Sequence, residues 1–159
     1  MRTIIHDLNE IKFSVDDKIL SSVNCKNNCI GCFSCWIKHP KKCALKDEYS
    51  NIVESIKDSK ELILISKCRY GCYSNEVKRV LERCIGYVLP YFTIRNNEIH
   101  HKSRYKKQIN MRVYFYGNNI SDEEKEIAKE LVNGNGINFN TKASETIFVK
   151  DILEIGGTL

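Results

Sequence analysis

The sequence predicts an α/β fold in which a parallel sheet of about five strands carries helices on both faces. Apolar segments of strand length alternate along the chain with amphipathic segments of helix length. Residues 61–66 hold four consecutive apolar residues, as expected for a strand buried on both faces of a parallel sheet. Strands separated by helices are joined by right-handed crossovers, which make neighbouring strands parallel. With 159 residues, 42% of them apolar, the chain has the size and core of one domain covering residues 1–159.

The first half of the chain predicts three strands, at residues 2–6, 18–23 and 61–66, and two helices. Asp47 is placed to cap the first helix, because its carboxylate can accept hydrogen bonds from the free amides of the first turn. Ser74 is placed to cap the second helix, which ends at Pro90. Apolar residues at helical spacing predict the buried faces of the two helices. They are Ile52, Val53 and Ile56 in the first, and Val77, Val80, Leu81, Cys84, Ile85 and Val88 in the second.

The second half predicts two more strands, at residues 111–116 and 146–149. Between them, residues 121–124 form a capping box that opens a third helix. Residues 91–108 are polar and aromatic, and they predict a long excursion over the surface rather than a regular element. Residues 156–159 predict a loose tail.

Cysteines are concentrated in one short stretch that follows the second predicted strand. Five of the eight lie between residues 25 and 43, a density that indicates redox, metal or cofactor chemistry rather than packing. Four of them, Cys29, Cys32, Cys35 and Cys43, have the spacing C-x2-C-x2-C-x7-C. Three thiolates spaced in this way can wrap one face of a [4Fe-4S] cluster, and the fourth can close it. Zinc also accepts four thiolates, with His39 or Cys25 as a substitute ligand.

Residues 29–36, followed by Pro40, Cys43, strand 62–66 and the step Arg69-Tyr70-Gly71, resemble the flavodoxin-fold family of NAD(P)H-dependent FMN oxidoreductases. That family includes the iron-sulfur flavoproteins, and the match covers about residues 24–90. The resemblance implies a flavodoxin-like three-layer sandwich and an FMN cofactor. It also implies a nicotinamide nucleotide as electron donor, a small or protein electron acceptor, and a homo-oligomer such as a dimer.

The same resemblance implies that the flavin ring lies against the loop that follows the third strand. A glycine there lets backbone amides approach a flat ring, and an arginine adds charge near the flavin. The predicted cofactor-binding residues are Cys68, Arg69, Tyr70, Gly71, Cys72, Tyr73 and Ser74, together with Cys32 and Phe33 of the cysteine stretch. The alternative is that Tyr70 and Tyr73 only cover the end of the sheet.

Three hypotheses remain for the predicted metal ligands Cys29, Cys32, Cys35 and Cys43. They hold a [4Fe-4S] cluster, they hold zinc, or they line the flavin loop as uncoordinated thiols. Cys84, on an apolar helix face, is predicted to be a small core residue.

One segment departs from the family pattern. Family members carry a glycine- and hydroxyl-rich loop after the first strand, which cradles the FMN phosphate. Residues 7–13 contain no glycine and two carboxylates, so they would repel a phosphate. Either Lys67, Arg69, Arg95 or Arg104 holds the phosphate, or the chain is a flavin-free descendant. In the second case it binds a metal or cluster as an electron carrier or interaction module.

The charge and hydropathy patterns argue against several other partners. The net charge of +5 is mild, and the basic segment 100–107 comes with no DNA- or RNA-binding signature, so nucleic-acid binding is not expected. The apolar runs are shorter than the roughly 20 residues of a membrane helix, and the N-terminus lacks signal-peptide features. These observations predict a cytoplasmic protein that contacts no membrane, in which thiols stay reduced.

Overall fold

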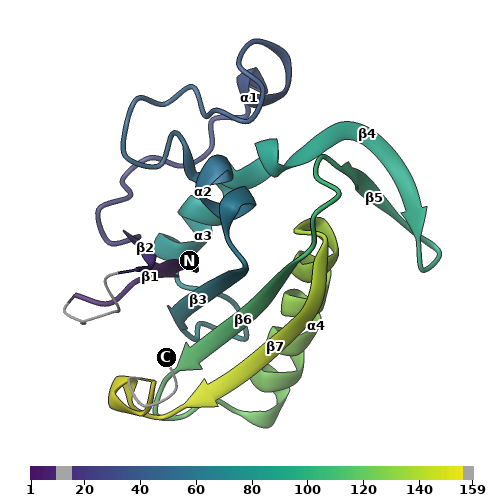
Figure 1. Cartoon of the computed structure of the whole chain (residues 1–159). Coiled ribbons are helices and arrows are strands. Elements are labelled where there is room, and N and C mark those ends of the chain that lie inside the picture. Colours follow the sequence, from purple (N-terminus) through teal and green to yellow (C-terminus); the bar gives the residue numbers. More distant parts are fainter. Residues whose placement is uncertain (10–15, 156–159) are drawn as a thin grey trace.

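The computed structural model describes residues 1–9 and 16–155, and its centre is a five-stranded parallel sheet (Figure 1). The strand order is β2-β1-β3-β6-β7, and every pair in this sheet is parallel. This arrangement confirms the predicted α/β, flavodoxin-like fold class. The strands are β1 (Thr3–His6), β2 (Lys18–Ser21), β3 (Glu61–Lys67), β6 (Ile109–Tyr116) and β7 (Thr141–Val149). Residues 10–13 of the predicted phosphate-repelling segment, and the predicted tail 156–159, lie outside the described residues.

Three α-helices pack their apolar residues into one core cluster on one face of the sheet. They are α2 (Ile52–Asp58), α3 (Asn75–Glu82) and α4 (Asp122–Asn138). Ser74 caps α3 by accepting a hydrogen bond from the Val77 amide, and Ser121 with Glu124 forms the predicted capping box of α4. A capping side chain satisfies an amide that the helix itself leaves free, so these residues fix where each helix begins.

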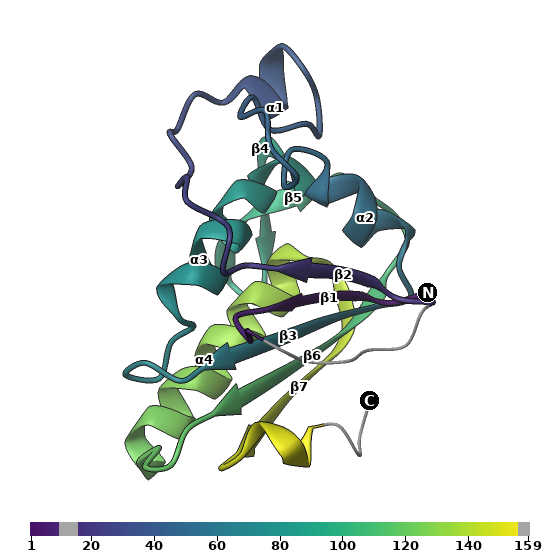
Figure 2. The same ribbon diagram turned by 90° about the vertical axis from the view of Figure 1, so that its left-hand side faces the viewer.

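On the other face of the sheet lies a short 3-10 segment, η2 (Ile152–Glu154), at the lower edge of Figure 2. Its residue Ile152 packs against a second cluster of buried side chains. The cluster consists of Ile4, Leu8, Ile63, Ile65, Tyr114 and Ile155. Both faces of β3 are therefore buried, as its unbroken apolar sequence predicted.

The prediction of an irregular excursion at residues 91–108 was wrong. This segment contains most of an antiparallel hairpin, β4 (Val88–Arg95) and β5 (Glu98–Ser103), which extends to the right in Figure 1. Asn96 and Asn97 form its turn with φ angles of 52° and 63°, a left-handed conformation that asparagine tolerates and that suits tight hairpins. The turn residues were visible in the sequence, but the strands pair only with each other, so their polar pattern resembled a loop.

Two helix boundaries also differ from the predicted ones. The second helix does not run to Pro90, because α3 ends at Glu82 and continues as the 3-10 segment η1 (Arg83–Tyr87). The N-cap of α2 is Asn51 rather than Asp47. Asp47 instead forms an ion pair with Arg83, the residue at which α3 ends and η1 begins. No local sequence pattern predicts such a long-range contact.

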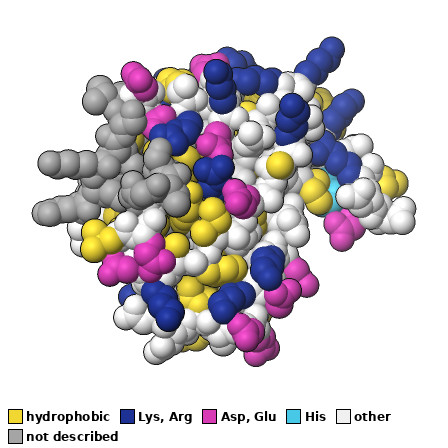
Figure 3. Space-filling model, turned by 60° about the horizontal axis from the view of Figure 1, so that its bottom comes forward, with side chains coloured by type: hydrophobic (Ala, Val, Ile, Leu, Met, Phe, Trp, Pro, Cys, Tyr) yellow, Lys and Arg dark blue, Asp and Glu magenta, His cyan; other side chains and the backbone are white. Residues whose placement is uncertain are grey.

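Charged side chains of both signs are intermixed on the face of the molecule shown in Figure 3. In the described part of the chain, none of the helices combines the length and the apolar character needed to span a membrane.

Candidate functional site

The cysteine stretch, defined here as residues 25–43, lines a cavity of about 640 Å³ together with the helical face of the molecule. The stretch leaves β2 and runs past α3 to a short helix, α1 (Ser34–Ile37), at the top of Figure 1. The four cysteines of the C-x2-C-x2-C-x7-C pattern all border this cavity: Cys29, Cys32, Cys35 and Cys43. The fold therefore places all four predicted metal ligands along one cavity.

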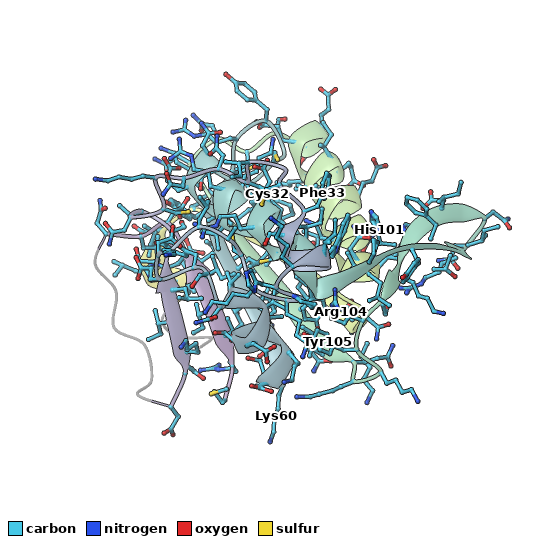
Figure 4. All side chains as sticks on the ribbon, turned by 90° about the horizontal axis from the view of Figure 1, so that it is seen from above. Cys32, Phe33, Lys60, His101, Arg104 and Tyr105 are labelled. Atoms are coloured by element: carbon cyan, nitrogen blue, oxygen red, sulfur yellow. The ribbon has the colours of Figure 1, made fainter. Side chains whose placement is uncertain are left out.

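Trp36 anchors the cysteine stretch to the rest of the molecule. Its indole N–H donates to the carbonyl oxygens of Ile85 at 3.1 Å and Val88 at 2.9 Å. Its ring stacks on Phe33 with centroids 5.3 Å apart and lies 5.1 Å from the His101 ring. Figure 4 shows Cys32 and Phe33 side by side, with His101 toward the hairpin. These contacts hold α1 against η1 and β4, so the thiols have a fixed support.

Cys35 is the most buried of the four cysteines. It is buried, and the pKa of its thiol is raised, first by burial and then by its neighbours Cys29, Cys43 and Cys32. Within the described residues, no group of three or more His, Cys, Asp or Glu side chains is arranged so that it could hold a metal ion. Thiols are nevertheless the type of donor that an iron–sulfur cluster or zinc takes.

A buried arginine beside the cysteines is the feature that sequence reasoning missed. The Arg83 side chain is completely buried, borders the cavity, and donates to both carboxylate oxygens of Asp47 at 2.7 and 2.5 Å. Burial disfavours the charged guanidinium, but Asp47 and Cys43 outweigh it and raise the pKa of Arg83 above its ordinary value. The available signal was a charged residue between Val80 and Cys84 on an otherwise apolar helix face.

The predicted flavin-ring loop, residues 68–74, forms a tight turn in which Arg69 and Cys72 exchange backbone hydrogen bonds. Tyr70 and Gly71 occupy the turn with φ angles of 53° and 74°, and the Tyr70 side chain is 88% exposed. Of the predicted ring-binding residues in this loop, Cys72 and Tyr73 border the cavity together with Cys32 and Phe33 of the cysteine stretch. The others, Cys68, Arg69, Tyr70, Gly71 and Ser74, do not border it.

We expect Gly71→Ala to lower the free energy of unfolding by about 2–4 kcal/mol, which urea denaturation would measure. A Cβ atom at this left-handed position would lie 2.7 Å from the Ile127 Cβ and 2.8 Å from the Glu124 carbonyl oxygen of α4. Gly134→Ala, which lies within α4 itself and has nothing within 4 Å of the added atom, is the control. Equal stability of the two variants would contradict the close packing of the turn on α4.

The position where FMN phosphate is expected holds a carboxylate instead. In a sheet of this strand order the ligand position lies where β1 and β3 end side by side. Asp7 lies there: its Oδ2 accepts the Lys67 backbone N–H at 2.9 Å, and its Oδ1 accepts the Tyr116 hydroxyl at 3.1 Å. No α-helix begins within residues 7–9 or 16–17, the described parts of the segment between β1 and β2. These residues do not fit a phosphate, because a carboxylate already occupies the available donors.

Two of the predicted alternative phosphate ligands have structural partners elsewhere. Arg95 donates to the Ile137 carbonyl oxygen at 3.0 Å and to the Ser103 hydroxyl at 2.6 Å. Arg104 donates to the Gly86 carbonyl oxygen at 2.8 Å. Both arginines belong to the hairpin region, which lies away from the carboxyl ends of the strands in Figure 1. The hairpin does not fold over the loop that follows β3, as their role as phosphate ligands would require.

Comparison with known proteins identifies a distant relative of this chain. No family model matches the sequence, and no solved structure matches it. A curated iron-sulfur flavoprotein of Archaeoglobus fulgidus is 25% identical over 134 residues, which cover 79% of this chain. The chain spans 63% of the length of that relative. The resemblance predicted from the sequence is therefore confirmed as a distant homology to an iron-sulfur flavoprotein.

Proposed function

We propose that this chain has a flavin-dependent redox role in which Cys29, Cys32, Cys35 and Cys43 bind a [4Fe-4S] cluster and pass electrons to a small acceptor or a protein partner. The observation that carries the proposal is that these four cysteines all border one cavity. The distant relation to an iron-sulfur flavoprotein supports it. A bound cluster would supply one-electron transfer.

The protein's own residues perform separate tasks around the four thiols. Trp36 holds the stretch against η1 and β4, and this anchor would fix the positions of the proposed ligands. Cys35 is buried and would be the ligand furthest from solvent. Cys32 is exposed and Phe33 is 47% exposed, so this side of the site is accessible to an electron donor or acceptor.

The second candidate is an FMN-dependent oxidoreductase that holds flavin as a resident cofactor and takes hydride from NAD(P)H. The relation to an iron-sulfur flavoprotein favours it, as does the presence of Cys72 and Tyr73 beside the same cavity. Asp7 opposes it, because the carboxylate stands where the phosphate would bind. We therefore assign the proposed redox chemistry to the cysteine site. In this proposal flavin is a redox partner of the chain and not its resident cofactor.

An absorption spectrum and a cofactor analysis of protein purified without oxygen would test this proposal. We expect a broad brown absorbance that dithionite bleaches, with about four iron and four sulfide per chain. A colourless protein with one zinc per chain would overturn the cluster. Two structured flavin bands with one FMN per chain would favour the second candidate over the first.

A further inference from the structure

The β4–β5 hairpin has one face on which large apolar side chains are exposed. Phe92 lies directly opposite His101, and Ile94 lies directly opposite Ile99. Because paired residues and every second residue of a strand point to the same side, these four side chains share one face. Phe92, Ile94 and Ile99 are 68%, 74% and 75% exposed. A contiguous apolar surface of this kind commonly marks an interaction site.

The opposite face of the hairpin is the one that contacts the body of the molecule. Arg95 lies on it, and its guanidinium donates to the Ile137 carbonyl oxygen of α4. Thr93 and His100, which lie opposite each other on the same face, are only partly exposed. The hairpin is therefore held with its apolar face outward. Neither of its strands pairs with another strand of the described residues, and two strands alone are only marginally stable in water.

The apolar face continues through a row of rings to the rim of the cysteine cavity. The Phe92 ring lies 4.8 Å from the His101 ring, His101 lies 5.1 Å from Trp36, and Trp36 lies 5.3 Å from Phe33, all between centroids. Phe33 and His101 border the cavity, and both are labelled in Figure 4. We call this row the apolar strip; it consists of Phe33, Trp36, His101, Phe92, Ile94 and Ile99, and it contains no Asp, Glu, Lys or Arg.

The apolar strip is large enough for a specific contact between two proteins. An aromatic side chain buries about 150–250 Å², and an isoleucine roughly half as much. Weighted by their exposed fractions, Phe33, Phe92, Ile94 and Ile99 expose roughly 300–450 Å². Two such strips would bury about 600–900 Å² of apolar surface, or about 1,000–1,500 Å² in total, because interfaces are roughly 60% apolar. That area reaches the range of about 1,200–2,000 Å² typical of stable interfaces.

We propose that two copies of this chain form a symmetric dimer through the apolar strip, in which the hairpin tip of each copy covers the cavity rim of the other. In a twofold contact, a residue at one end of the strip meets the other end in the second copy. Ile94 and Ile99 of one copy pack on Phe33 of the other, and the two Phe92 rings meet near the axis. The strip can face itself because it carries no like charges to repel each other. The dimer requires no bound cofactor.

Sedimentation equilibrium of the full-length protein tests the dimer. Ile94→Glu/Ile99→Lys removes the apolar tip but leaves the net charge unchanged, and its opposite charges form a cross-strand pair that supports the hairpin. We expect a wild-type dimer at about 10 μM and a dissociation constant at least about 100-fold higher in this variant. A wild type that remains monomeric at roughly 100 μM would overturn the proposal, and the strip would then serve a different partner.

Thr93→Glu/His100→Lys is the matched control, because it places the same two charges opposite each other on the inward face of the same hairpin. It should dimerise as the wild type does, and circular dichroism should show that both double variants are folded. Equal dissociation constants in the two double variants would contradict a contact through the apolar face.

Phe33→Asn tests where the hairpin tip lies. Phe33 has a φ angle of 52°, which asparagine tolerates, and it belongs to the cysteine stretch rather than to the hairpin. We expect its dissociation constant to rise at least about tenfold, since the tip of the second copy loses its apolar contact. Dimerisation equal to that of the wild type would show that the hairpins meet without covering the cavity rim, and would overturn the proposed arrangement.

Discussion

Cys35→Ala is expected to leave the protein with at least about tenfold less iron per chain after anaerobic reconstitution, because a ligand at the centre of the set is lost. Cys35 is the buried member of the four, and Cys29, Cys32 and Cys43 are more exposed. Removing it leaves three ligands with no thiol at the protected end of the site. Iron and sulfide analysis, together with the visible spectrum, would measure the effect.

Cys72→Ala is the matched control for this prediction. Cys72 borders the same cavity and is partly buried, but it comes from the loop after β3 and lies outside the C-x2-C-x2-C-x7-C pattern. It should therefore keep the iron content of the wild type. If Cys72→Ala lost as much iron as Cys35→Ala, the ligand set would differ from the one inferred from the spacing.

Asp7→Asn is expected to bind FMN at least about tenfold more tightly than the wild type, since it removes the charge that opposes the phosphate. The carboxylate of Asp7 takes the Lys67 amide and the Tyr116 hydroxyl, which are the donors available where β1, β3 and β6 end. An asparagine side chain is neutral and carries donors of its own. Fluorescence titration of FMN against both proteins would measure the change.

Tyr116→Phe separates charge from local packing. It removes the 3.1 Å hydrogen bond to Asp7 but leaves the carboxylate charged. Its FMN affinity should therefore match that of the wild type. If Asp7→Asn bound FMN no more tightly than Tyr116→Phe, the charge of Asp7 would not be what disfavours the phosphate.

Regular elements were predictable wherever the sequence pattern was local and strong. The four apolar residues within 61–66 predicted the central strand, and Ser74 and the 121–124 capping box predicted the starts of α3 and α4. The β4–β5 hairpin was missed because only its turn residues carry a strong signal. Its strands pair with each other away from the main sheet and expose many side chains, so no apolar stripe marks them.

The candidate site was predictable as a set of residues but not as an arrangement. Spacing predicted the four cysteines as a set, because ligands of one metal centre must reach a common point from a short chain segment. The place where they meet depends on Trp36, which reaches carbonyl groups 49 and 52 residues further along the chain. A tertiary contact also decides which residues of the loop 68–74 reach the cavity. The turn of this loop packs on α4, and only Cys72 and Tyr73 of the loop border the cavity.

By itself, the sequence determined the class of fold, and it predicted four cysteines as a ligand set and a segment after β1 that disfavours a phosphate. These properties follow from periodicity, spacing and charge within short segments. Only the tertiary structure decided that Arg83 lies buried between Asp47 and the cysteines, and that Asp7 joins β1 to β3 and β6. Those contacts join residues 36, 60 and 109 positions apart, and the free energy that forms them comes from packing of the whole chain.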